Sequence, residues 1–217
     1  MGENSNDTCK ILLIGESGVG KTSIISQYVE ETFKEDQETS AGASFSTKKL
    51  ELKNGNLVTL EIWDTAGQEK FRALTQLFYK ESSAAILVYD ITRKDSFEQI
   101  KEYWFNQVKE KSPNNVIIAL AANKIDLFEN EEVEEKIARD FANEIGAIFM
   151  MTSAKNKDGI DELFDIIANK IFKCSGDDDN GDGNTIDRIK EIRGKSVKIS
   201  ENKHFDNNNG KKKKGCC

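Results

Sequence analysis

Apolar and polar residues follow two alternating kinds of spacing between residues 10 and about 173. Short continuous apolar runs are typical of strands buried on both faces of a parallel sheet, and they alternate with stretches that have the 3.6-residue period of an amphipathic helix. Stretches 45–52 and 57–63 alternate in polarity around Asn54-Gly55, which favours an antiparallel hairpin at the sheet edge. The buried strands expected from the runs are 11–14, 84–89, 116–122 and 147–151. The helices expected from the period are 21–29, 74–79, 96–110, 133–145 and 160–172. The pattern predicts an α/β domain with a six-stranded, mostly parallel sheet, one antiparallel edge strand and about five helices.

The composition changes after this domain. Residues 174–217 are rich in Asp, Asn, Gly and Lys, and such a segment buries too little apolar surface to offset the entropy of ordering it. We therefore expect a flexible N-terminus over 1–9, a domain over 10–173 and a disordered tail over 174–217. The tail has ten Lys and Arg against eight Asp and Glu, a net charge of +2, so of the total of −7 the rest of the chain carries −9.

The residue counts exclude several chemistries. The chain has one His, in the tail, and four Cys without the spacing of a zinc site or a disulfide framework. A Ser-His-Asp triad inside the domain is therefore excluded. No apolar run approaches the roughly 20 residues of a membrane span.

A phosphate-binding loop follows the first predicted strand. Residues 15–22 read Gly-Glu-Ser-Gly-Val-Gly-Lys-Thr and match the pattern G-x-x-x-x-G-K-[ST], with a helical period directly after them. The glycines let backbone N–H groups surround phosphates, Lys21 reaches the β- and γ-phosphates, and the hydroxyl of Thr22 is a ligand for Mg²⁺. The sequence thus predicts a nucleoside-triphosphate site.

Two later loops indicate which base is bound. Asn123-Lys124-Ile125-Asp126 ends the fifth predicted strand, and the Asp126 carboxylate can accept hydrogen bonds from N1–H and the exocyclic amine of guanine. Adenine has no such pair of donors and would leave the carboxylate unsatisfied. Thr152-Ser153-Ala154-Lys155 ends the sixth strand, where a backbone N–H can reach the guanine carbonyl. The loops together favour guanine.

With the run Asp64-Thr65-Ala66-Gly67-Gln68-Glu69 after the third strand, residues 10–173 resemble the Ras superfamily of small GTPases, whose G domain is a P-loop NTPase fold. Within it the chain resembles the Rab family, because Trp63 precedes this run, Lys70-Phe71-Arg72 follows it and the chain ends in two cysteines. Residues 42–45 are most similar to the endosomal Rab subgroup.

The resemblance implies the roles of individual residues. Gln68 would be catalytic and orient the attacking water, while Mg²⁺ would be held by Thr22, Ser40 and, through water, Asp64. No arginine finger is evident, so we expect slow hydrolysis without an activating protein. The nucleotide-binding residues implied are Glu16, Ser17, Gly18, Val19, Gly20, Lys21, Thr22, Ser23, Phe33, Ser40, Gly67, Asn123, Lys124, Asp126, Ser153, Ala154 and Lys155.

The same resemblance implies a switch. Loops 37–45 and 66–78 would be ordered by GTP and released on hydrolysis, presenting an effector surface that includes Ala41, Phe45, Trp63 and Phe78. For these aromatic side chains, ordinary core packing is the alternative. Ser40-Ala41-Gly42 stands where the family has Thr-Ile-Gly, so we expect a switch loop that opens more often.

The tail resembles a membrane anchor. Four lysines precede Cys216 and Cys217, and prenylation of both cysteines would add the second signal that stable anchoring needs. The expected location is the cytoplasmic face of endosomal membranes, with a cytosolic pool. The expected partners are an exchange factor, a GTPase-activating protein, effectors, a GDP-dissociation inhibitor and a prenylation escort, with no nucleic acid.

The sequence therefore predicts a GTP-hydrolysing switch of the Rab type in vesicle traffic. Two alternatives remain open at this point. One is a weakly hydrolysing nucleotide-binding scaffold, which Ser40 and Ala41 motivate; the other is a phosphotransferase that uses the same phosphate loop.

Overall fold

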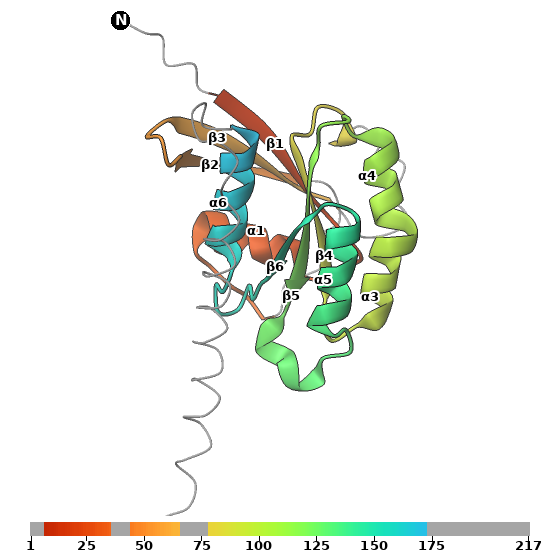
Figure 1. The fold of residues 1–217 in the computed structure, drawn as a ribbon. Helices are drawn as coiled ribbons and strands as arrows, with labels where there is room; N and C mark the ends of the chain where they lie inside the picture. The colour runs from red at the N-terminus through yellow and green to blue at the C-terminus, as the bar shows by residue number, and fades with distance from the viewer. Residues whose placement is uncertain (1–6, 36–43, 66–77, 173–217) are drawn as a thin grey trace, which may run out of the picture. The chain divides into compact units, whose positions relative to one another are not determined.

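Six strands form one sheet in the order β2-β3-β1-β4-β5-β6 within the part of the chain that the structure, a computed structural model, describes (Figure 1). That part comprises residues 7–35, 44–65 and 78–172 and belongs to a compact unit, Met1–Cys174. Only β2 runs antiparallel to its neighbour β3; the other pairs are parallel, which confirms the predicted sheet. The strands are β1 (Asp7–Ile14), β2 (Ser44–Glu51), β3 (Leu57–Asp64), β4 (Ala84–Asp90), β5 (Ile117–Asn123) and β6 (Ile148–Met151).

The helices cover both faces of this sheet (Figure 1). They are α1 (Lys21–Glu30), α3 (Lys94–Gln99), the π-helical turn η2 (Ile100–Trp104), α4 (Phe105–Lys111), the 3₁₀ segment η3 (Ile125–Asn130), α5 (Glu135–Glu144) and α6 (Ile160–Ile171). The predicted helix 96–110 is thus a continuous helix with a π turn in its middle. The predicted helix 74–79 lies outside the described residues except for its last two.

Two element boundaries differ from the predictions for clear reasons. β1 begins at Asp7 because its parallel pairing with β3 continues to the Asp7–Val58 register, whatever the polarity of the side chains there. The helix predicted from residue 133 begins at Glu135, because Glu134 has an extended ψ of 132° and the N–H of the buried Val133 donates to the carbonyl of Ile91. A backbone bond to another segment holds Val133 before the helix starts.

The core consists of two layers, one on each face of the sheet. Ile11 and Leu13 of β1 belong to the layer that α1 and α6 cover, whereas Leu12 and Ile14 belong to the layer under α3, α4 and α5. Successive strand residues point to opposite faces, so a strand covered on both sides must be apolar throughout. This explains why the central strands are continuous apolar runs.

None of the helices in the described ranges has the length and apolar character needed to span a bilayer.

Candidate functional site

The loop between β1 and α1 has a backbone that requires glycine. Gly15 has a φ of +150°, and a Cβ there would lie 2.2 Å from the carbonyl oxygen of Val88. Gly20, with a φ of +96°, stands directly before the first residue of α1. These positive φ angles let the loop turn tightly around a space that faces the N-terminus of α1.

Lys21, the first residue of α1, is buried with 6% of its surface exposed. Its ammonium donates hydrogen bonds to the carbonyl oxygens of Gly15 and Glu16, both at 2.8 Å. Burial lowers the pKa of Lys21 to about 8, although the charges of Asp64 and Glu16 act in the opposite direction. A desolvated ammonium held this way favours an anionic ligand that compensates its charge.

The side chains of Thr22 and Asp64 lie together beside this lysine and present two oxygen atoms that can serve as metal ligands. The hydroxyl of Thr22 donates to Oδ2 of Asp64 at 2.5 Å, and Asp64 is buried at the end of β3. Among the described residues no group of three or more His, Cys, Asp or Glu gathers to hold a metal ion. A hydroxyl and one carboxylate nevertheless fit Mg²⁺, which in nucleotide sites takes few protein ligands and uses phosphate oxygens and water for the rest.

Two side chains from the α3–α4 region hold the phosphate loop from outside. The indole N–H of the buried Trp104, in η2, donates to the Glu16 carboxylate at 3.0 Å. Nη1 of Arg93 donates to the carbonyl of Ser17 at 3.0 Å. Sequence reasoning missed both contacts, although the π turn that carries Trp104 is a feature often found near functional sites.

Asn123 links the phosphate loop to the base loops. Its amide Nδ2 donates to the carbonyl of Val19 at 2.8 Å, and its Oδ1 accepts a bond from the hydroxyl of Thr152 at 3.2 Å. Because Asn123 is buried with 1% exposure, these bonds fix three loops relative to one another. Asn123 thus organises the pocket wall and itself lines the pocket.

Lys124 and Asp126 are held by their own partners at the other end of the pocket. Lys124 has a left-handed φ of 68°, and its ammonium pairs with the buried carboxylate of Asp90 at 2.6 Å. Oδ1 of Asp126 accepts a hydrogen bond from the Ser153 hydroxyl at 2.6 Å. Sequence reasoning did not single out Asp90. The bond from Ser153 leaves Oδ2 of Asp126 and the second lone pair of Oδ1 available to a ligand.

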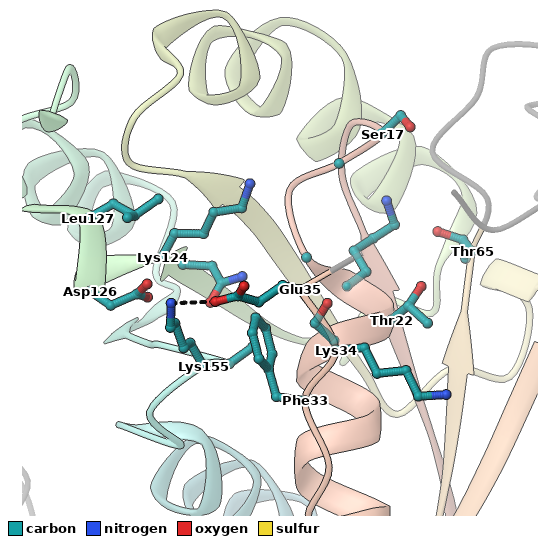
Figure 2. A pocket seen from close by; sticks show the side chains of 16 residues that line it. Ser17, Thr22, Phe33, Lys34, Glu35, Thr65, Lys124, Asp126, Leu127 and Lys155 are labelled. Carbon is teal, nitrogen blue, oxygen red and sulfur yellow. Dashed lines mark hydrogen bonds and ion pairs between the residues drawn. The ribbon is translucent and has the colours of Figure 1, made fainter. Parts of the chain in front are cut away.

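These groups line a pocket of about 310 Å³. Figure 2 shows Ser17, Thr22 and Thr65 at one end and Asp126, Lys124 and Lys155 at the other. The ammonium of Lys21 and several hydroxyl groups thus stand at one end, and the carboxylate of Asp126 stands between lysines at the other. A ligand with phosphates at one end and a hydrogen-bond-donating ring at the other fits this arrangement. Of the predicted residues, Ser17, Gly18, Gly20, Lys21, Thr22, Ser23, Phe33, Asn123, Lys124, Asp126, Ala154 and Lys155 line the pocket.

The segment after α1 forms one wall near the base end. Phe33 lines the pocket and is 36% exposed. Glu35, which the sequence did not single out, also lines it, and its carboxylate pairs with the ammonium of Lys155 at 2.8 Å (Figure 2). The segment and the loop after β6 therefore meet across the pocket.

Three predicted effector residues stack on β2, β3 and the segment before β4. Phe45 and Trp63 have ring centroids 5.1 Å apart, and Trp63 and Phe78 are also 5.1 Å apart. Phe45 is 57% exposed, while the other two are half-buried. The rings thus form a continuous aromatic row with one exposed end.

Several predicted site residues lie outside the described residues. They are Ser40, Ala41, Gly67, Gln68, Cys216 and Cys217.

The chain is similar to proteins of known family. The model of the Ras family matches residues 10–173. Ras-related protein Rab-22A of Homo sapiens is 46% identical over 162 residues, which cover 75% of this chain and 82% of that protein. Ras-related protein Rab-31 of Mus musculus is 44% identical over 177 residues, covering 82% and 89%. Ras-related protein Rab-21 of Mus musculus is 38% identical over 208 residues, covering 96% and 90%.

Proposed function

The chain belongs to the Ras family, and we propose that the pocket between its phosphate loop and Lys155 is the site where it binds guanine nucleotides. Its similarity to three Rab proteins over most of its length makes it a Rab GTPase of endosomal trafficking, which hydrolyses GTP to GDP. The family binds GTP and GDP together with Mg²⁺. What remains to be assigned is which residues of this chain carry each step.

The arrangement of Asp126 supports the choice of guanine. Oδ1 of Asp126 accepts from Ser153 at 2.6 Å, so the carboxylate is oriented before any ligand binds. Oδ2 and the second lone pair of Oδ1 can then accept from the N1–H and the exocyclic amine of guanine, a pair of donors that adenine lacks. Phe33 would pack against the base, and the loop containing Ala154 would donate a backbone N–H to its carbonyl.

At the opposite end, Lys21 would bind the β- and γ-phosphates. The N–H groups of residues 16–23 would surround the phosphate oxygens, with the N-terminal dipole of α1 adding a favourable field. Thr22, Asp64 and Ser40 would hold Mg²⁺, which neutralises charge on the phosphates when bound. Binding the anion compensates the buried ammonium of Lys21, which is the reason for its unusual environment.

Hydrolysis would depend on residues 67 and 68. The N–H of Gly67 would contact the γ-phosphate and Gln68 would orient water in line with it, so catalysis is largely positioning. An activating protein would supply the missing cationic charge. Ala41 and the aromatic row of Phe45, Trp63 and Phe78 would meet effectors in the GTP form.

The tail would bring the protein to membranes. Prenylated Cys216 and Cys217, with the preceding lysines, would anchor it to the cytoplasmic face of endosomal membranes. A GDP-dissociation inhibitor would maintain a cytosolic pool, and a prenylation escort would present the chain for modification. An exchange factor would load GTP at the membrane.

Competition binding tests the proposed site. We expect unlabelled GDP to displace a fluorescent GDP from the purified protein at least a thousandfold more effectively than ADP does, because ADP leaves Asp126 unsatisfied. Equal displacement by ADP would contradict the assignment. For hydrolysis, single-turnover phosphate release should collapse in Gln68→Leu while GDP affinity is kept; release at the wild-type rate would remove Gln68 from the mechanism.

A further inference from the structure

Two ion pairs join the segment after α1 to the loop after β6. The carboxylate of Glu31 pairs with Lys157 at 2.9 Å, and that of Glu35 pairs with Lys155 at 2.8 Å. The partners are 126 and 120 residues apart in the sequence. Figure 2 shows the second pair crossing the base end of the pocket. We call the two together the double ion pair.

The backbone turns at both members of the first pair. Glu31 directly follows α1 as its C-terminal cap with a φ of 56°, and its N–H donates to the carbonyl of Ser26. Lys157 has a φ of 67°. Left-handed conformations of residues other than glycine are unfavourable and persist only where the surroundings hold them. Asp161 of α6 also pairs with Lys157 at 3.3 Å and orients its ammonium toward this region.

The double ion pair flanks Phe33. Glu31 and Glu35 stand two residues before and two residues after it, so the aromatic wall of the pocket is tied at both ends to the loop that carries Lys155. A base enclosed between Phe33 and this loop leaves only when the two segments separate. Separation breaks both pairs.

We propose that Glu31, Glu35 and Lys157 are positioning residues that slow the release of guanine nucleotide by holding Phe33 against the base loop. This inference rests on the proposed guanine-nucleotide site. The pairs act at the base end, away from Lys21 and Thr22, so they affect the residence time of the nucleotide and leave the hydrolytic step unchanged.

The solvent exposure of the paired side chains sets the expected size of the effect on the release rate. The side chains of Glu31 and Glu35 are 71% and 73% exposed, and their lysines are 30% and 49% exposed. Exposed pairs contribute little individually, so breaking one should speed release about two- to fourfold, and breaking both on the order of fivefold to tenfold. Hydrogen bonds from the lysines hold the pKa of both glutamates below the usual value, so both pairs are intact at neutral pH.

The experiment measures the dissociation rate of fluorescent GDP from full-length protein. The variants are Glu31→Gln, Glu35→Gln, their combination, and Lys157→Gln alone and with Glu31→Gln. Glu30→Gln is the matched control, because Glu30 bonds to Thr32 of its own segment. Rates are taken at about 0.05 M and 1 M NaCl, since the Debye length falls to about 3 Å at 1 M. Single-turnover hydrolysis and thermal melting are measured on the same variants.

We expect faster release in the Glu31→Gln and Glu35→Gln variants and no change in Glu30→Gln. Single-turnover hydrolysis should be unchanged in Glu31→Gln, whose side chain stands outside the pocket lining, and melting checks that each variant is folded. Lys157→Gln should add nothing once Glu31 is replaced. The variant that combines Glu31→Gln with Glu35→Gln should lose the part of the salt dependence that the control retains. Wild-type release rates in that combined variant would overturn the inference, as would a hydrolysis rate that falls in Glu31→Gln. If the wild type does not bind GDP at all, the proposed site itself fails.

Discussion

Replacing Asp126 with asparagine should invert the base preference of the pocket. Oδ1 of Asp126 accepts from the Ser153 hydroxyl at 2.6 Å, and an asparagine Oδ1 can accept the same bond. The amide N–H₂ then occupies the position of Oδ2 and faces the exocyclic amine of guanine, while Oδ1 still accepts from N1–H. Xanthine has a carbonyl at the corresponding ring position, which this amide can satisfy.

The magnitude follows from the lost hydrogen bonds. Each bond to the carboxylate is charge-assisted and contributes about 1.5–3 kcal/mol; the substitution removes the bond to the exocyclic amine, makes the bond to N1–H a neutral one and places donor against donor. We expect a loss of about 3–5 kcal/mol in GDP binding, which is roughly 10²- to 10⁴-fold in Kd. The Kd for xanthosine diphosphate should improve at least tenfold.

The assay is equilibrium competition of GDP and xanthosine diphosphate, at saturating Mg²⁺, with Asp140→Asn as a matched control on the exposed side of α5. Adding Ser153→Ala to Asp126→Asn should reduce the gain for xanthosine diphosphate, because the amide is then free to rotate. If Asp126→Asn binds GDP within threefold of the wild type, the carboxylate does not read the base and the reasoning is refuted.

Further outcomes can be checked independently. Phosphate binding should raise the lowered pKa of Lys21, so GDP affinity should be constant below about pH 7 and fall above pH 8. At about pH 8.5 the protein should take up protons when GDP binds, which calorimetry detects as a binding enthalpy that depends on the buffer. Gly15→Ala should lower the free energy of unfolding by more than about 2 kcal/mol, because its Cβ would lie 2.2 Å from the backbone oxygen of Val88. Gly55→Ala, whose Cβ meets nothing within 4 Å, should cost only about 1 kcal/mol from its positive φ, and equal losses in urea unfolding would contradict the steric argument. Replacing the Cys216–Cys217 pair with serines should turn membrane staining of the tagged protein diffuse, and unchanged staining would oppose the anchor.

Much of the fold could be predicted because its signals are local. The run of residues 84–89 is apolar since both faces of β4 are covered, and Asn54-Gly55 marks the turn before β3. The π turn at Ile100–Trp104 could not be predicted from the sequence. The spacing of apolar residues indicates which side of a helix is buried, but one extra residue in a single turn changes that spacing too little to be recognised. Trp104 and its contact to Glu16 were missed for the same reason.

The sequence predicted which types of residue form the candidate site better than it predicted the contacts between them. The phosphate-loop pattern predicted that Lys21 and Thr22 lie in the pocket, because a glycine-rich turn before a helix N-terminus is typical of phosphate binding. Nothing in the sequence indicated that Asn123 reaches the carbonyl of Val19 or that Lys124 pairs with Asp90. Such contacts depend on which loops the sheet order brings to one edge.

The sequence by itself determined the α/β pattern, the phosphate loop and the position of the Asp126 carboxylate that we propose reads the base, because each depends on residues within a few positions of one another. Only the tertiary structure decided that Ser153 orients that carboxylate and that Glu31 and Glu35 meet lysines more than a hundred residues away. The physical reason is that periodicity and turn chemistry act along the chain, whereas an ion pair or a hydrogen bond between loops requires the parallel strands to set those loops side by side.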